Sequence, residues 1–255
     1  MVKDKSLEQI ESSAYFAFRE SQSRLLIGNK REAGYHVTDL CKPCMRNVFY
    51  SKQAEASSTV QTMDTSAMAY LYMGNAIHAV SDLKGKLHEF KMFYHIEEDK
   101  GLDQAEYLQM STEDKWKVLV GTVDDVIESN GQLVVIDKKT WVSKGFKLTA
   151  PKDHHVLQCN IYRMMLQKCA GLDPVVGCIL YLDIGDRIEK PLPLGFNMQD
   201  TKLTRADVVS KWNLLEEARK NKTVPARVKN WMCDGYCAHA MRCFTQGDEL
   251  VEKIS

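Results

Sequence analysis

Residues 118–140, VLVGTVDDVIESNGQLVVIDKKT, decide the fold of this chain. Two runs rich in Val and Ile, 118–128 and 132–138, lie on either side of Asn130-Gly131. Because an Asn-Gly pair readily adopts the backbone of a two-residue turn between paired strands, the stretch predicts a β-hairpin. A two-residue turn also fixes which residues of the two strands face each other.

In that register Asp124 faces Asp137, and opposed residues share one face of the sheet with Cβ atoms roughly 5 Å apart. Lys139 returns to the same face because side chains alternate along a strand, whereas Asp125 and Lys138 point the other way. Two carboxylates and a lysine suit a hard divalent cation and a phosphoryl transition state. The alternative is a solvated face with an ordinary ion pair. It fits poorly, because the strands are otherwise apolar and two opposed acids repel each other.

Composition and pattern extend this hairpin to a mixed α/β fold. At 44% hydrophobic and 27% charged residues, the chain can bury a real core. Strand patterns precede and follow the hairpin, and helical periodicity separates them. The order therefore predicts a mixed sheet with helical cover. The predicted helices are 6–27, 64–87, 152–169 and one from the Thr204-x-x-Asp207 cap to about 220, and the other predicted strands are 89–96 and 175–183.

Charge and hydropathy exclude several classes of function. The chain has 34 basic and 34 acidic residues, so a site for a polyanion must be a local patch. No apolar run approaches the roughly 18 residues of a transmembrane helix. The first residues, MVKDKSLEQIESS, lack the apolar core of a signal peptide. We therefore expect a cytoplasmic protein without a membrane partner.

Four motifs in the chain resemble the PD-(D/E)XK nuclease superfamily in its RecB-like form. Gly121-Thr-Val-Asp124 matches G-x-x-D, and Asp137-Lys-Lys139-Thr140 matches the D-x-K-T that follows an apolar strand. Gly74-Asn-Ala-Ile-His78 resembles the upstream glycine-to-histidine motif, and Gln158-x-x-x-Tyr162 resembles the downstream one. The resemblance implies a restriction-endonuclease-like mixed central sheet flanked by helices.

The resemblance also implies a role for each motif residue. His78, Asp124 and Asp137 would bind Mg²⁺ or Mn²⁺, with the backbone carbonyl of Lys138 as a further ligand. Lys139 would position the attacking water or neutralise charge on the phosphate. Gln158 and Tyr162 share one helix face and would complete the catalytic set. Glu89 is a candidate supporting acid beside the site.

Cysteines at both ends of the chain form a second constellation. Four of them resemble the iron–sulfur branch of RecB-like nucleases, which includes the CRISPR-associated exonucleases and the AddB-type recombination nucleases. The resemblance implies a [4Fe–4S] cluster closing a helical appendage, and four cysteines suit such a cluster. The implied ligands are Cys44, Cys233, Cys237 and Cys243.

Two alternatives to this cluster stay open. The family trio begins C-x2-C, whereas three residues separate Cys233 from Cys237. A four-cysteine Zn²⁺ site is therefore an alternative, and Cys41 is a rival to Cys44 as the first ligand. The remaining cysteines lie in helix or strand patterns and are expected to be buried small hydrophobes. They are Cys159, Cys169 and Cys178.

Two basic runs are candidate contacts for DNA, because cations with interleaved aromatic residues suit phosphates and unstacked bases. The first follows the hairpin and the second ends the last long helix. A solvated loop and a frayed helix end are the alternative interpretation. The residues chosen from these runs are Lys144, Lys147, Arg219 and Lys222.

Together these patterns predict an N-terminal helical segment at 1–36, a nuclease domain at 37–245 and a tail at 246–255. We expect a divalent-metal-dependent deoxyribonuclease, an exonuclease on single-stranded DNA or DNA ends, with a structural iron–sulfur cluster. CRISPR adaptation, with integration proteins as partners, and recombination or repair, with a helicase, are the expected settings. The alternative function is a non-catalytic or partner-activated DNA-binding protein with a zinc site. Cleavage polarity, DNA versus RNA preference, the balance of endo- and exonuclease activity, and oligomeric state stay open.

Overall fold

The computed structural model describes residues 32–56, 85–141, 148–184, 191–230, 233, 237 and 239–245. The chain divides into two compact units, Met1–Ala33 and Gly34–Ser255, and the second unit carries the fold described below.

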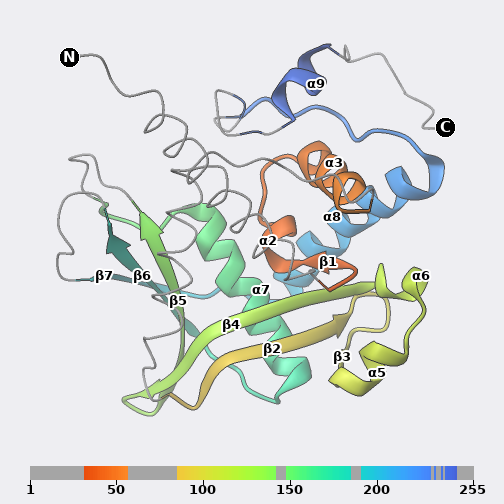
Figure 1. Ribbon diagram of the computed structural model, residues 1–255. Helices are drawn as coiled ribbons and strands as arrows, with labels where there is room; N and C mark the ends of the chain where they lie inside the picture. Colours follow the sequence, from red (N-terminus) through yellow and green to blue (C-terminus); the bar gives the residue numbers. More distant parts are fainter. Residues whose placement is uncertain are drawn as a thin grey trace, which may run out of the picture. The chain divides into compact units, whose positions relative to one another are not determined.

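A seven-stranded mixed sheet forms the centre of this unit (Figure 1). The strand order is β3–β2–β4–β5–β6–β7, and β1 pairs with β4 outside this path. The pairs β5–β6 and β1–β4 are parallel, and the others are antiparallel. The predicted mixed α/β sheet is therefore confirmed. The strands are β1 (Tyr35–His36), β2 (Leu87–His95), β3 (Lys100–Leu102), β4 (Val118–Ser129), β5 (Gln132–Trp141), β6 (Val176–Asp183) and β7 (Leu192–Asn197).

The central hairpin forms in the predicted register. Ser129 faces Gln132 across the turn, and the ladder runs from there to the pair Asp125–Ile136. Asn130 and Gly131 both have positive φ, +52° and +74°, as a two-residue hairpin turn of this kind requires. Local turn chemistry therefore sets which side chains of β4 and β5 share a face.

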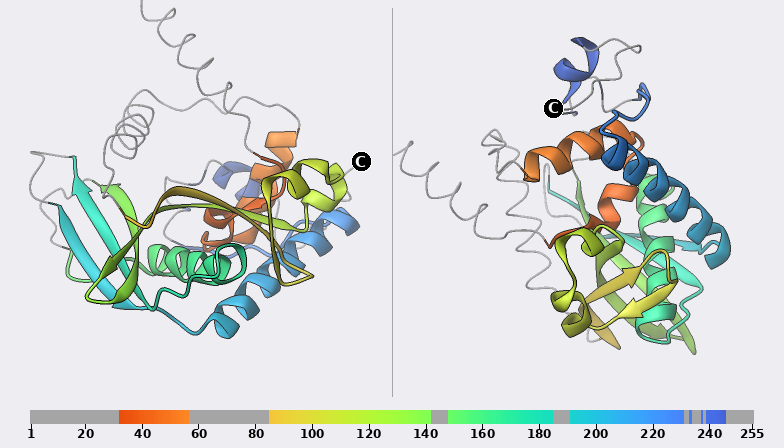
Figure 2. Two further views of the ribbon diagram at one scale, coloured as in Figure 1. Left: turned by 90° about the horizontal axis from the view of Figure 1, so that it is seen from below. Right: turned by 90° about the vertical axis from the view of Figure 1, so that its right-hand side faces the viewer.

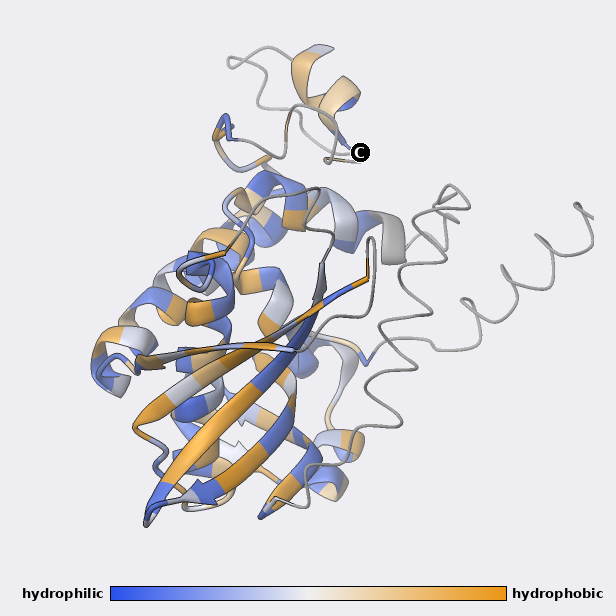
Figure 3. Ribbon diagram, turned by 90° about the vertical axis from the view of Figure 1, so that its left-hand side faces the viewer, coloured by the Kyte–Doolittle hydropathy of each residue, from blue (hydrophilic) through white to orange (hydrophobic). Residues whose placement is uncertain are grey.

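Helices pack on the sheet and on one another. In Figure 2, α7 lies along the sheet and α8 lies against α7. The core between α7 and the strands is apolar, with Leu119, Val123, Met164, Met165 and Ile179 almost fully buried. Figure 3 shows apolar residues gathered along the strands. The helices are α2 (Val37–Leu40), α3 (Met45–Ala56), α5 (Gln104–Gln109), α6 (Thr112–Lys115), α7 (Asp153–Cys169), α8 (Thr201–Asn221) and α9 (Ala240–Thr245).

Several predicted boundaries need correction. Helix α8 begins at Thr201, because Asp200 caps it by accepting a hydrogen bond from the Lys202 N–H at 2.8 Å. Thr204, the predicted cap, is fully buried inside the helix. Strand β2 begins at Leu87, where the sequence pattern predicts the end of a helix. The rest of that predicted helix, and the one at 6–27, lie outside the described residues.

Other elements escaped prediction. The sequence pattern showed neither β7 nor the short helices α5 and α6, although Asp103 and Glu106 form a capping box at the start of α5. No helix in the part of the chain that the structure describes is long and apolar enough to cross a membrane.

Candidate active site

The charged residues of the hairpin separate onto two faces. On one face, Lys139 Nζ lies 2.8 Å from Asp137 Oδ1. Asp124 belongs to the same face, and its Oδ2 accepts a hydrogen bond from the Lys138 backbone N–H at 2.6 Å. On the other face, Lys138 Nζ lies 2.7 Å from Asp125 Oδ2. As strand alternation predicts, Asp125 and Lys138 thus lie on the face opposite Asp124, Asp137 and Lys139.

On the first face, Asp137 keeps the Lys139 side chain protonated. Asp137 is fully buried and Asp124 is 7% exposed. Burial acts to lower the pKa of Lys139, but the charge and the hydrogen bond of Asp137 outweigh it and raise that pKa. Lys139 is therefore an ammonium ion held beside a carboxylate. Buried carboxylate oxygens are the hard donors that Mg²⁺ or Mn²⁺ prefers, so these residues fit such an ion.

Helix α7 brings its polar pair to the same place. Gln158 Nε2 donates a hydrogen bond to the Tyr162 hydroxyl at 2.8 Å, and both side chains are buried. Burial and then the negative charge of Asp137 raise the pKa of Tyr162, so its hydroxyl stays protonated. Cys159 directly follows Gln158 and is buried near Asp137 and Asp124. Burial raises the pKa of its thiol well above the usual range.

The motif glycine explains how α7 comes so close to β4. A Cβ atom added to Gly121 would lie 2.7 Å from Cγ2 of Val37 and 3.2 Å from Cε1 of Tyr162. A side chain at Gly121 would therefore require Val37 to move and would crowd the Tyr162 ring. The G-x-x-D spacing therefore joins a packing requirement at Gly121 to a chemical one at Asp124.

A cleft of about 990 Å³ opens beside these residues. Lys139 and Gln158 line it, and three further lysines from distant segments, Lys42, Lys152 and Lys211, complete its basic wall. Lys152 belongs to the first basic run of the sequence. Sequence reasoning missed Lys42 and Lys211, because no local pattern groups the α2–α3 turn and the middle of α8 with that run.

Of the four predicted DNA contacts, the structure describes Arg219 and Lys222. Lys144, Lys147 and His78 are outside the described residues. Arg219 does not line the cleft, and it pairs with Glu216 at 2.8 Å and with Glu113 at 2.6 Å. Lys222 is the C-cap of α8 in a left-handed conformation with φ of +52°.

Glu89, the candidate supporting acid, lies where the β2–β4 ladder is interrupted. The ladder pairs His88 with Asp125 and Phe90 with Val123, and leaves Glu89 between them beside Asp124. Glu89 has a φ of +45°, which marks a local distortion of the strand.

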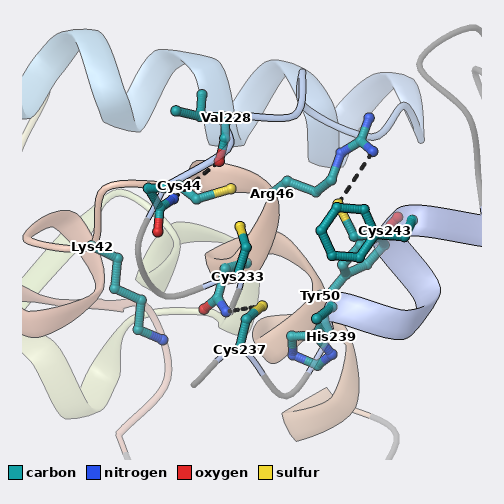
Figure 4. Close-up of a pocket in the computed structure, with 13 residues that line it drawn as sticks. Lys42, Cys44, Arg46, Tyr50, Val228, Cys233, Cys237, His239 and Cys243 are labelled. Atoms are coloured by element: carbon teal, nitrogen blue, oxygen red, sulfur yellow. Dashed lines mark hydrogen bonds between the residues drawn. The ribbon is translucent and has the colours of Figure 1, made fainter. Parts of the chain in front are cut away.

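The four cysteines of the predicted cluster line one pocket between α3 and the C-terminal segment (Figure 4). Cys41 instead lines the cleft that contains Lys139. Among the residues that the structure describes, no three His, Cys, Asp or Glu side chains stand together as ligands of a metal ion. Of the other cysteines, Cys159 is fully buried as predicted, whereas Cys169 and Cys178 are half-buried.

Comparison with known proteins adds to this geometry. The family model of the PD-(D/E)XK nuclease superfamily matches residues 51–244. This chain belongs to that superfamily. It is therefore a nuclease of the phosphodiester-cleaving class, whose members generally use divalent metals such as Mg²⁺ or Mn²⁺. A search of curated proteins gives no significant match.

A search of solved structures gives matches at low sequence identity. The structure described as "Crystal structure of SSO0001" has a TM-score of 0.57 and 20% identity, over 92% of this chain and 97% of that one. An alkaline exonuclease from Laribacter hongkongensis, LHK-Exo, has a TM-score of 0.43 and 12% identity, over 74% of this chain and 92% of that one. At these identities the likeness to SSO0001 extends to the fold alone.

Proposed function

We propose that this nuclease is a metal-dependent exonuclease acting on single-stranded DNA or DNA ends. The observation that carries the proposal is the meeting of Asp124, Asp137 and Lys139 beside a cleft walled by lysines. The carboxylates would hold Mg²⁺ or Mn²⁺, with His78 and the Lys138 carbonyl as the further ligands that the family resemblance implies. When bound, the ion would polarise the phosphate and lower the pKa of a bound water.

The residues of the chain have separate tasks in this proposal. The Lys138 N–H orients Asp124 through its 2.6 Å hydrogen bond. Lys139, kept protonated by Asp137, offers positive charge where negative charge develops on the phosphate. Gln158 and Tyr162 present a neutral amide and a protonated hydroxyl from α7. Such fixed donors contribute most when water is excluded.

The lysine-walled cleft is proposed to bind the DNA strand. Lys42, Lys152 and Lys211 bring positive charge to it although the net charge of the chain is zero. Contacts between lysines and phosphates give salt-dependent affinity without sequence preference. Lys144 and Lys147 stay candidates for the same strand, since they follow β5 directly in the sequence.

Nuclease assays on end-labelled single-stranded DNA, double-stranded DNA and RNA, with Mg²⁺, Mn²⁺ or EDTA, test this function. Asp137→Asn and Lys139→Met should each lower the cleavage rate on the order of 100-fold or more. Lys100→Met, which removes an exposed lysine paired with Glu98, is the control and should cut at the wild-type rate.

Each outcome of these assays has a distinct meaning. Cleavage that persists in EDTA would contradict the metal dependence. DNA binding without cleavage by the wild-type protein would favour the alternative, a non-catalytic DNA-binding protein. Internal cuts in circular single-stranded DNA would contradict the exonuclease assignment.

We also propose that Cys44, Cys233, Cys237 and Cys243 hold a structural [4Fe–4S] cluster. Their shared pocket supports this, as do two polar side chains of α3. Asn47 Nδ2 donates to Cys237 Sγ at 3.0 Å, and Arg46 Nη1 lies 3.7 Å from Cys243 Sγ. Hydrogen-bond donors near sulfur are typical outer-shell partners of metal-bound cysteines.

Anaerobic purification tests the cluster. Cys44→Ser should lose iron and labile sulfide together, whereas Cys41→Ser, its matched control in the other pocket, should keep both. A colourless wild-type protein with one zinc per chain would replace the cluster by a zinc site. From the family resemblance we further propose a role in CRISPR adaptation or in recombination and repair. Co-purification with an integration complex or a helicase tests that role.

A further inference from the structure

The face of the hairpin opposite the proposed metal site carries a buried ion pair that the chemistry described above does not use. We propose that the side chains of Asp125 and Lys138 have a positioning role: they hold β4 and β5 in the orientation that brings Asp124, Asp137 and Lys139 together at the active site. This inference rests on the proposed function and adds two side chains that touch neither metal nor substrate.

The Asp125–Lys138 pair is fully enclosed. Lys138 Nζ lies 2.7 Å from Asp125 Oδ2, and the two side chains are 1% and 0% exposed. In the β4–β5 ladder, Asp125 directly faces Ile136, so Lys138 is its diagonal neighbour on the same face. A long side chain reaches a diagonal neighbour. The contact therefore links β4 and β5 diagonally on the face opposite the active site.

Lys138 is held from both faces of the sheet at once. Its side chain reaches Asp125 on one face, while its backbone N–H donates to Asp124 Oδ2 on the other at 2.6 Å. Because the peptide unit is planar and rigid, rotation at Lys138 would move that N–H away from Asp124. The same rotation would swing Asp137 and Lys139, the residues on either side of it.

A third residue extends the arrangement to the next strand. His88 of β2 faces Asp125 in the β2–β4 ladder, and its Nδ1 lies 2.9 Å from Asp125 Oδ1. The His88 side chain is 32% exposed, so this series of contacts runs from solvent to the centre of the sheet. Three adjacent strands are thus linked directly behind the site.

An ion pair at this place is better explained by orientation than by stability. Taking two charges out of water is costly, and apolar residues of similar size often stabilise a fold as well as a buried pair does. Apolar residues, however, can rotate without losing a specific partner. The Asp125–Lys138 ion pair cannot rotate without separating its two charges. Partners behind the direct ligands of a metal commonly tune its affinity.

The test separates orientation from stability. The double variant Asp125→Asn/Lys138→Met removes both charges while nearly keeping the volumes. Mn²⁺ binding to the full-length variant, measured by titration calorimetry, should weaken about 10- to 100-fold, and the Mn²⁺ concentration for half-maximal cleavage should rise in parallel. The control, Glu98→Gln/Lys100→Met, removes an exposed ion pair beyond the other end of β2 and should bind Mn²⁺ as the wild type does.

A second variant guards against a double variant that does not fold. His88→Phe removes the half-exposed outer contact without touching the buried pair, and should weaken Mn²⁺ binding in the same direction by a smaller factor. If the wild type binds Mn²⁺ and cuts DNA, and both variants match it, the positioning role is overturned alone. A wild type that neither binds Mn²⁺ nor cuts would overturn the proposed function and this inference with it.

Discussion

Arg219 allows a test of whether a residue contacts DNA or stabilises the fold. The sequence predicts a DNA contact at this position, whereas in the structure Arg219 contacts other residues of the fold. Its Nε lies 3.1 and 3.3 Å from the two carboxylate oxygens of Glu216, and its Nη2 lies 2.8 Å from Glu216 Oε2. Glu216 is only 5% exposed and also accepts a hydrogen bond from the Tyr35 hydroxyl at 3.0 Å. Arg219 further pairs with Glu113 and lies 5.4 Å above the ring of Trp116.

These contacts give a magnitude for Arg219→Ala. Hydrogen bonds to a charged group contribute about 1.5–3 kcal/mol when buried. The cation–π contact with Trp116 adds about 0.5–1 kcal/mol. The pair with Glu113, which is 65% exposed, adds at most about 1 kcal/mol. Tyr35 still donates a hydrogen bond to Glu216 in the variant, and the contributions of neighbouring contacts are not additive. We therefore expect Arg219→Ala to lower the unfolding free energy by about 2–4 kcal/mol.

Urea unfolding followed by tryptophan fluorescence measures that loss, with Lys220→Ala as the control. Lys220 is the exposed neighbour of Arg219 on α8, and its removal should change the unfolding free energy by less than about 0.5 kcal/mol. Arg219→Ala should leave the salt dependence of DNA affinity unchanged. The reasoning is refuted if Arg219→Ala keeps wild-type stability and lowers the slope of log Kd against log salt by about 1, the mark of a lost phosphate contact.

Three further predictions concern packing, capping and pH. Gly121→Ala should lower the unfolding free energy by about 1–3 kcal/mol and slow cleavage, because the added Cβ would crowd Val37 and the ring of Tyr162. Thermal unfolding measures the first effect and a cleavage assay the second. Asp200→Ala should cost about 0.5–2 kcal/mol by removing the N-cap of α8, and Asp200→Ser should recover most of it in urea unfolding. Burial, and to a lesser extent nearby positive charge, lowers the pKa of His155 to about 3. Between pH 6.5 and 3 the unfolded chain therefore binds a proton at His155 that the folded chain does not bind. Stability should therefore fall as the pH drops from 6.5 towards 3, and in His155→Gln the measured fall should be smaller.

The sequence by itself determined the hairpin and the side-chain alternation within it. Asn130-Gly131 permits the turn without help from the rest of the fold, and the turn fixes the register of β4 and β5. Once the register is known, strand alternation places Lys139 with Asp137 and Lys138 with Asp125. Gln158 and Tyr162 were predictable for the same reason, since residues four apart share a helix face.

The sequence could also suggest that Cys44 joins the C-terminal cysteines, but only the fold puts Cys41 into a different pocket. The two thiols are three residues apart, and α2 and the turn after it carry them in different directions. Strand alternation likewise predicts that Asp125 and Lys138 point away from the site, but it does not predict what surrounds them. Facing away from the site means full burial here, not exposure to solvent.

Only the tertiary structure decided the cleft and the partners of the basic residues. The cleft beside Lys139 is lined by Lys42, Lys152 and Lys211, although about 110 residues separate the first two. Arg219 does not line this cleft and pairs instead with Glu216 and Glu113. Turns, strand alternation and helix faces depend on residues a few positions apart, so a sequence displays them directly. The packing of whole elements decides which distant side chains become neighbours. A buried carboxylate is costly unless it pairs with a cation, so it pairs with a nearby one wherever that residue lies in the sequence.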